Sequence, residues 1–188
     1  MSNIIFFFKD ILHKFVHWNI VKKCLVKLNM DKLTFKYATP EETPDVMRFI
    51  KAIAEYEKMS DEVNGDEQQL YEELFVKRHA EVFFAMLGEK KIGFALYFHN
   101  FSTFVGRAGL YVEDVFIYPE YRGKGYGTAI FKRLAEIAVE RNCGRMEWCC
   151  LDWNKPSINF YLGMGARPMS EWTTYRLSGE TLRRMGNK

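Results

Sequence analysis

The segment at residues 109–131, GLYVEDVFIYPEYRGKGYGTAIF, constrains the fold more than any other part of the chain. Its first half is rich in Val, Ile, Tyr and Phe and predicts a β-strand, which Pro119 ends. A glycine-rich turn, RGKGYG, follows, and from Thr128 to Arg141 apolar residues recur at helical spacing. The segment therefore predicts a strand, a tight turn and a helix in direct succession.

The rest of the chain alternates between strand-like and helix-like patterns. A nearly continuous apolar run at 145–151 is typical of a strand that is buried on both faces in parallel pairing. The order of elements predicts an α/β (α+β) fold, in which helices flank a mixed sheet. Strands are expected at 32–39, 81–87, 90–100, 109–119 and 145–151, with a last strand or hairpin at 166–177. Helices are expected at 39–59, 66–79, 128–141 and 155–165.

Single residues mark where these elements begin and end. Thr39 followed by Glu42 resembles a capping box, and Asn154 is a candidate N-cap for the helix at 155–165. Gly88 lies between two strand-like runs and predicts a hairpin. Gly144 stands where the glycine that ends a helix is expected. The inner face of the helix at 128–141 should consist of Ile130, Leu134, Ile137 and Ala138.

The length and composition indicate one globular domain of a protein that does not bind nucleic acid. The chain has 188 residues and a formal net charge of +3, of which residues 1–29 carry +4 and the remainder −1. The residues after 29 therefore lack the excess of basic side chains that a nucleic-acid-binding domain carries. The four cysteines form no C-x-x-C pair, so we expect no metal site, and packed thiols at Cys149 and Cys150. This usage fits a reducing compartment, and we expect a cytoplasmic protein.

The first 29 residues differ from the rest, because they are both apolar and basic. Their longest apolar run, IIFFF, is too short to span a bilayer, and no small-residue cleavage site follows it. Three interpretations are open: an amphipathic surface helix, a targeting segment, or an extension upstream of a start at Met30. We favour the last, which makes 1–29 an N-terminal extension and 30–188 the folded domain, and we expect no membrane association.

The turn RGKGYG is suited to bind a phosphate. Glycines let the backbone turn tightly, so that its N–H groups converge, and the positive end of the following helix adds to the same point. The spacing fits neither the dinucleotide-binding fingerprint nor the ATP phosphate loop. A turn without a ligand is the alternative. The candidate phosphate-binding residues are Arg122, Gly123, Lys124, Gly125, Tyr126 and Gly127.

Two adjacent acids, Glu113 and Asp114, stand in the middle of the predicted apolar strand. Buried carboxylates are costly unless they are paired or used. Because adjacent side chains of a regular strand point to opposite faces, both acids can reach one ligand only if the strand bulges there. The alternative is that one acid faces solvent and the other forms a structural ion pair.

Three separated motifs resemble one family. R-x-x-G-x-G after an apolar strand is similar to the acetyl-CoA pyrophosphate loop of the GNAT superfamily of N-acetyltransferases. LYVEDVFIYPEYRGKGYG, DWNKPSINFYLGMGA and IKAIAEYEKM together resemble its spermidine/spermine (diamine) acetyltransferase branch over residues 33–182. The resemblance implies a mostly antiparallel sheet with acetyl-CoA between the fourth and fifth strands. It also implies that the coenzyme contacts Asn154, Ser157 and the backbone of Val115, Phe116 and Ile117.

The same resemblance assigns the chemistry. It implies that Tyr161 protonates the departing thiolate of the coenzyme and that Glu113 is a catalytic carboxylate, in a direct attack of the amine on acetyl-CoA within a ternary complex. Tyr56, Glu57, Glu113 and Asp114 are expected to bind the amine. The alternative for Tyr161 is a packed aromatic on an amphipathic helix, and from the residues alone Glu57 is a solvated helix end.

The expected substrate is a primary amine of a small cationic molecule: a polyamine, a diamine or a lysine-like compound. The polyamine enzymes of this branch carry an acid in the segment after the tyrosine, where this chain has Thr173. The resemblance also implies a homodimer. Two alternatives from other classes are a coenzyme-A-binding module without catalysis and a peripheral membrane protein that binds through residues 1–29.

Overall fold

The computed structural model describes residues 32–186, which form two compact units that divide after Cys149. The predictions for residues 1–29 and for a start at Met30 lie outside the described residues. Within residues 32–186, no helix is both long and apolar enough to cross a membrane.

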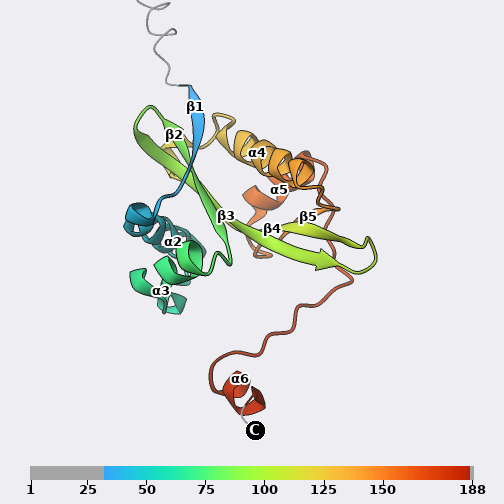
Figure 1. Cartoon of the computed structure of the whole chain (residues 1–188). Helices are drawn as coiled ribbons and strands as arrows, with labels where there is room; N and C mark the ends of the chain where they lie inside the picture. Colours follow the sequence, from blue (N-terminus) through green and yellow to red (C-terminus); the bar gives the residue numbers. More distant parts are fainter. Residues whose placement is uncertain (1–31, 187–188) are drawn as a thin grey trace, which may run out of the picture. The chain divides into compact units, whose positions relative to one another are not determined.

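A five-stranded sheet forms the centre of the first unit, and its strands lie side by side in chain order (Figure 1). The first three pairings are antiparallel and the last, β4 with β5, is parallel. This confirms the predicted mixed, mostly antiparallel sheet. The strands are β1 (Leu33–Tyr37), β2 (Glu81–Leu87), β3 (Lys90–Ser102), β4 (Arg107–Ile117) and β5 (Met146–Trp148).

Helices occur at all the predicted places, and the second unit contains one further helix, α6 (Gly179–Gly186), which was not predicted. In the first unit they are α2 (Thr43–Glu57), α3 (Glu67–Tyr71), which continues as the π-helix η3 (Glu72–Val76), and α4 (Tyr126–Glu140). Short 3-10 turns stand at η1 (Pro40–Glu42), η2 (Ser60–Glu62) and η4 (Pro119–Tyr121). The second unit holds α5 (Lys155–Gly163) and α6 (Gly179–Gly186).

Each face of the sheet has its own apolar core, because successive side chains of a strand point to opposite faces. On one face, α2 packs Val46 and Phe49 against Phe84 and Phe94 of the central strands. On the other face, α4 contributes a fully buried stripe to a second cluster. This stripe is the predicted one, Ile130, Leu134, Ile137 and Ala138.

Two predictions about strands are wrong. The run at 145–151 forms a strand of only three residues, β5, whose side chains are half-buried, and Cys149 after it is exposed rather than packed. Its parallel pairing is correct: Leu110 faces Met146 and Val112 faces Trp148. The expected last strand at 166–177 is also absent, since among the described residues no strand follows β5. A segment forms a strand only where another strand is available to pair with it, and apolar composition does not determine this.

The helix ends follow the predicted signals except at Gly144. The Thr39 N–H donates to Glu42 Oε2 at 3.1 Å, as a capping box requires. At the end of α4, however, the left-handed residue is Asn142, with φ of 53°. The Cys143 N–H donates to the Ala138 carbonyl at 2.8 Å, which closes a Schellman motif. Gly144 is required for packing instead, since a Cβ there would lie 2.7 Å from Val105 Cγ1.

Gly93 holds β3 close to β4, and its replacement gives a first testable prediction. A Cβ at this position would lie 2.6 Å from the Phe116 carbonyl oxygen, inside the sheet. We expect Gly93→Ala to lower the free energy of unfolding by about 1–3 kcal/mol, because the backbone must shift to admit a methyl group. Urea denaturation measures this. Gly163→Ala is the control, because a Cβ there meets nothing within 4 Å; equal losses would contradict the packing argument.

Candidate active site

Strand β4 bulges at Glu113. Leu96 pairs with Asp114, whereas the next residue of β3, Tyr97, pairs with Val112, so that Glu113 is the extra residue without a partner in β3. A bulge of this kind bends the strand and re-aims its side chains. The distortion needed for both acids to face one ligand is therefore present. Glu113 is exposed, whereas Asp114 is half-buried.

Two neighbouring carboxylates act on Asp114 at this bulge. Burial, together with the negative charges of Glu113 and Glu57, raises the pKa of Asp114 to about 7. Glu57 reaches the cluster from the last turn of α2, and burial raises its pKa as well. None of the three forms an ion pair among residues 32–186. Unpaired and partly buried acids favour a cationic guest.

The edge of β4 beyond the bulge carries free backbone groups. The parallel pairing with β5 ends at Val112, so the residues after it have β3 alone as a strand partner in the described part of the chain. The Tyr118 N–H donates to the Ile92 carbonyl at 3.1 Å, and hydrogen-bonded pairs alternate along an antiparallel ladder. By this alternation Phe116 bonds to β3, whereas the backbone groups of Val115 and Ile117 point to the open edge, where the Ile117 carbonyl already accepts a hydrogen bond from Arg122 Nε.

The glycine turn has the conformation that a phosphate site requires. Gly123 and Gly125 have φ values of 72° and 82°, in the left-handed region that glycine adopts without strain. Helix α4 begins at Tyr126, directly after Gly125. The first hydrogen bond of the helix runs from the Ala129 N–H to the Gly125 carbonyl. The three preceding N–H groups therefore have no acceptor within the helix. Converging N–H groups at a helix N-terminus form a ready anion site.

The two cations of the turn are held by different contacts. Arg122 Nε donates to the Ile117 carbonyl at 2.8 Å, and its guanidinium carbon lies 4.8 Å from the Tyr56 ring centre. Lys124 Nζ instead donates to the Glu120 carbonyl at 2.9 Å, within its own turn. Arg122 thus ties the turn both to the end of β4 and to α2.

The remaining predicted residues lie in the second unit, on α5. Asn154 Oδ1 accepts a hydrogen bond from the Ser157 N–H at 3.3 Å, which confirms the predicted N-cap. Tyr161 follows one turn after Ser157, and its ring centre lies 5.6 Å from that of Phe160. The structure therefore groups the acids, Tyr56 and the glycine turn in one unit, and Asn154, Ser157 and Tyr161 in the other. That Tyr161 faces the acids stays a prediction.

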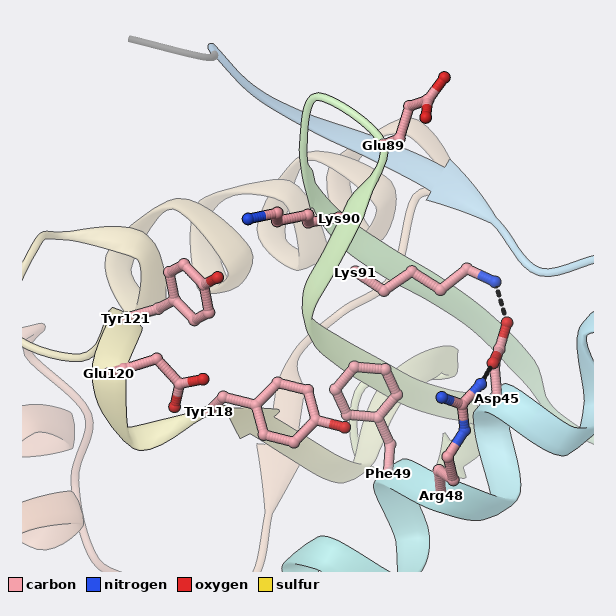
Figure 2. A pocket seen from close by; sticks show the side chains of 9 residues that line it. All are labelled: Asp45, Arg48, Phe49, Glu89, Lys90, Lys91, Tyr118, Glu120 and Tyr121. Carbon is pink, nitrogen blue, oxygen red and sulfur yellow. Dashed lines mark hydrogen bonds and ion pairs between the residues drawn. The ribbon is translucent and has the colours of Figure 1, made fainter.

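A cavity of about 450 Å³ lies elsewhere in the first unit, between α2, the β2–β3 turn and η4 (Figure 2). Phe49, Tyr118 and Tyr121 contribute its aromatic walls, and none of the predicted site residues lines it. On one side of its rim, Asp45 forms ion pairs with both Lys91 and Arg48. We assign no role in the reaction to this cavity.

Sequence reasoning missed two features of the site. It did not indicate that Asp114, rather than Glu113, is the acid whose pKa is raised to about 7. It also did not predict that the Arg122 guanidinium lies over the Tyr56 ring. Neither has a signal in the sequence, because both depend on which residues approach from α2. Within residues 32–186, no three His, Cys, Asp or Glu side chains are grouped so as to hold a metal ion.

Comparisons with known proteins agree with the resemblance drawn from the motifs. Residues 48–166 match the model of the acetyltransferase (GNAT) family. The thialysine N-epsilon-acetyltransferase of Sus scrofa is 34% identical over 171 residues, covering 85% of this chain and 100% of that protein. The spermidine/spermine N(1)-acetyltransferase-like protein 1 of Homo sapiens is 29% identical over 167 residues, covering 82% of this chain and 24% of that protein.

Among solved structures, an integron cassette protein from the mobile metagenome of V. cholerae superposes with a TM-score of 0.69 at 28% identity, covering 83% of this chain and 98% of that one. The family match includes the bulged strand, the glycine turn and α5. The chain therefore belongs to the acetyltransferase (GNAT) family, in the branch that the diamine-like motifs predicted, and it is an N-acetyltransferase.

Proposed function

We propose that this enzyme transfers the acetyl group of acetyl-CoA to a primary amine of a small cationic substrate. The observation that carries the proposal is a cluster of three unpaired carboxylates: Glu113 and Asp114 on the strand that leads into the glycine turn, and Glu57 at the end of α2. The cluster suits an ammonium group and the turn suits a diphosphate. One strand therefore connects a donor site with an acceptor site.

The donor would bind along the carboxyl half of β4 and the N-terminus of α4. In this proposal the backbone N–H groups of Gly123, Gly125 and Gly127, with those of Lys124 and Tyr126, hold the pyrophosphate. The open edge at Val115 and Ile117 would accept the pantetheine arm and the acetyl carbonyl. Phe116 bonds to β3 through its backbone, so it would contribute its side chain only. Asn154 and Ser157 would contact the coenzyme from α5.

The acceptor chemistry requires that a protonated amine lose a proton. An alkylamine has a pKa of about 10, so its neutral form is scarce at pH 7. Asp114, with its pKa near 7, is placed to take this proton, while Glu113 and Glu57 hold the ammonium group. This refines the sequence prediction, in which Glu113 was the catalytic carboxylate. Tyr56 would complete the acceptor site beside Glu57.

The transfer then needs no covalent enzyme intermediate. The amine nitrogen attacks the acetyl carbonyl carbon, the new N–C bond forms, and the C–S bond to the coenzyme breaks. The amine proton passes to Asp114, directly or through water, and the Tyr161 phenol gives its proton to the departing thiolate. The products are the acetylated amine and coenzyme A.

Within the proposed substrate class, a lysine-like amine is the leading candidate. The relative from Sus scrofa is named for thialysine and matches over its whole length. The acid that polyamine enzymes of the branch carry after the tyrosine is replaced here by Thr173. Polyamines and diamines remain in the class because three carboxylates can hold more than one positive charge.

A thiol-release assay with acetyl-CoA tests this proposal. We expect release to depend on the amine, to be greatest with thialysine, lysine or ornithine, to be lower with spermidine and diaminopropane, and to be absent with neutral amides. Calorimetry with coenzyme A, run in parallel, measures donor binding by itself. Coenzyme binding without thiol release over the whole panel would reject the proposed acceptors and favour a coenzyme-binding module.

We further propose that residues 30–188 form the acetyltransferase domain and that 1–29 precede it as an extension. The family match at 48–166 supports this division, since it lies entirely within the proposed domain. A cytoplasmic homodimer is the expected state of the protein. Sedimentation velocity of the full chain measures its oligomeric state.

A further inference from the structure

We propose that Arg122 is a positioning residue that holds Tyr56, and through it Glu57, in place relative to the coenzyme turn. The inference rests on the proposed function, because it takes Glu57 to be part of the acceptor site. It differs from the expectation that Arg122 serves the coenzyme alone. Its basis is the direction of the side chain, which runs back toward α2.

The contacts of Arg122 span three elements. Its Nε donates to the Ile117 carbonyl at the end of β4, at 2.8 Å. Its guanidinium carbon lies 4.8 Å from the ring centre of Tyr56 on α2 and 5.3 Å from that of Phe116 on β4. Arginine is suited to this place, because its planar group can stack on an aromatic face while it donates a hydrogen bond in the same plane. A lysine could not make both contacts.

Tyr56 in turn precedes Glu57 at the end of α2. The helix stops there, since Lys58 has a left-handed φ of 61°. A residue at a helix end is held less firmly by the helix itself, so side-chain contacts decide where it lies. The contact with Arg122 therefore fixes the end of α2 that supplies Glu57 to the carboxylate cluster. The charge of Glu57 acts on Asp114, which extends the connection to the proposed proton acceptor.

This arrangement connects the two sites through one side chain. A coenzyme bound to the turn would restrict the motion of Arg122 as well, and through Tyr56 it would restrict Glu57 in the acceptor site. The coupling is reciprocal by thermodynamic necessity, so a bound amine should also tighten coenzyme binding. Lys124, in the same turn, instead contacts the Glu120 carbonyl and the Tyr121 ring, whose centre lies 5.6 Å from Nζ.

Kinetics of matched variants test the inference. We expect Arg122→Met to raise the KM of the amine about two- to fivefold, the range that loss of an exposed cation–π contact allows. Tyr56→Leu should do the same, and Tyr56→Phe, which keeps the ring, should raise it less. The double variant Arg122→Met/Tyr56→Leu should be no worse for the amine than either single variant, because both remove one contact. Lys124→Met should raise the coenzyme constant while leaving the amine KM within about twofold.

Two results would overturn the inference. The first is that Arg122→Met and Lys124→Met raise the KM of the amine by the same factor. The second is that the KM of the amine in the double variant Arg122→Met/Tyr56→Leu rises by the product of the two single-variant factors. Glu57→Gln separates this failure from failure of the proposed acceptor site. If Glu57→Gln raises the amine KM while Arg122→Met does not, only the positioning role is rejected. If Glu57→Gln leaves the amine KM unchanged, the acceptor site itself is misassigned.

Discussion

Tyr161→Phe is expected to lower kcat by about 10²- to 10³-fold, the contribution typical of a positioned general acid. The substitution removes one hydroxyl group and keeps the ring that packs beside Phe160. Without the phenol, the coenzyme must leave as a free thiolate, so the loss should appear in kcat. Single-turnover kinetics with acetyl-CoA and a saturating amine measure it.

The affinity for the coenzyme provides the control for Tyr161. Calorimetry should give the same dissociation constant for coenzyme A in Tyr161→Phe and in the unaltered protein, because the proposed role concerns the departing sulfur alone. The neighbouring variant Phe160→Leu should keep kcat within about tenfold while lowering the melting temperature, as expected for a packing residue. Full turnover in Tyr161→Phe would reject the assignment to Tyr161.

Asp114→Asn is the second variant with a large expected effect. For the unaltered enzyme, kcat/KM for the amine should rise with pH and level off above about pH 7, because Asp114 must be ionised to accept a proton and its pKa is about 7. Asp114→Asn should lose about 10²- to 10⁴-fold in rate at pH 7.5, and it should also lose this limb of the profile. Stopped-flow assays between pH 5.5 and pH 9 measure both quantities.

Stability should change in the opposite direction in the same variant. A carboxyl group whose pKa is raised by folding favours its neutral form in the folded state. Its penalty is absent below the ordinary pKa of 3.8, grows as the pH rises and is complete above about 7. The full penalty corresponds to about 4 kcal/mol, as an upper bound. Asp114→Asn should therefore be more stable than the unaltered protein at pH 8 and indistinguishable from it near pH 4.

Glu113→Gln is the matched comparison for Asp114. Glu113 is exposed on the bulge, so its replacement should raise the KM of the amine without the gain in stability at pH 8. If kcat/KM for the amine still rises up to about pH 7 in Asp114→Asn but no longer does so in Glu113→Gln, the proton acceptor is Glu113 instead. Loss of activity together with loss of stability in Asp114→Asn would instead indicate a structural ion pair.

The secondary-structure elements that depend on residues close together in the chain could be predicted from the sequence. The stripe on α4 repeats at helical spacing from Ile130 to Ala138, about two and a half turns, so the residues that it buries could be named in advance. The hairpin at Gly88, the cap at Asn154 and the strand–turn–helix unit around RGKGYG depend on nearest neighbours in the chain. The need for a bulge at Glu113 also followed from the sequence, because two adjacent acids cannot share one face of a regular strand.

The features that depend on contacts between residues distant in the chain could not be predicted and became evident in the folded structure. Strand β5 is short and no strand forms at 166–177, because pairing requires a neighbouring edge that composition does not specify. Gly144 serves packing against Val105, 39 residues away, rather than the end of α4. The pKa of Asp114 and the stacking of Arg122 on Tyr56 both depend on where α2 ends relative to β4. Local periodicity fixes which face of an element is buried, whereas solvation, charge and side-chain direction depend on the elements that pack against it.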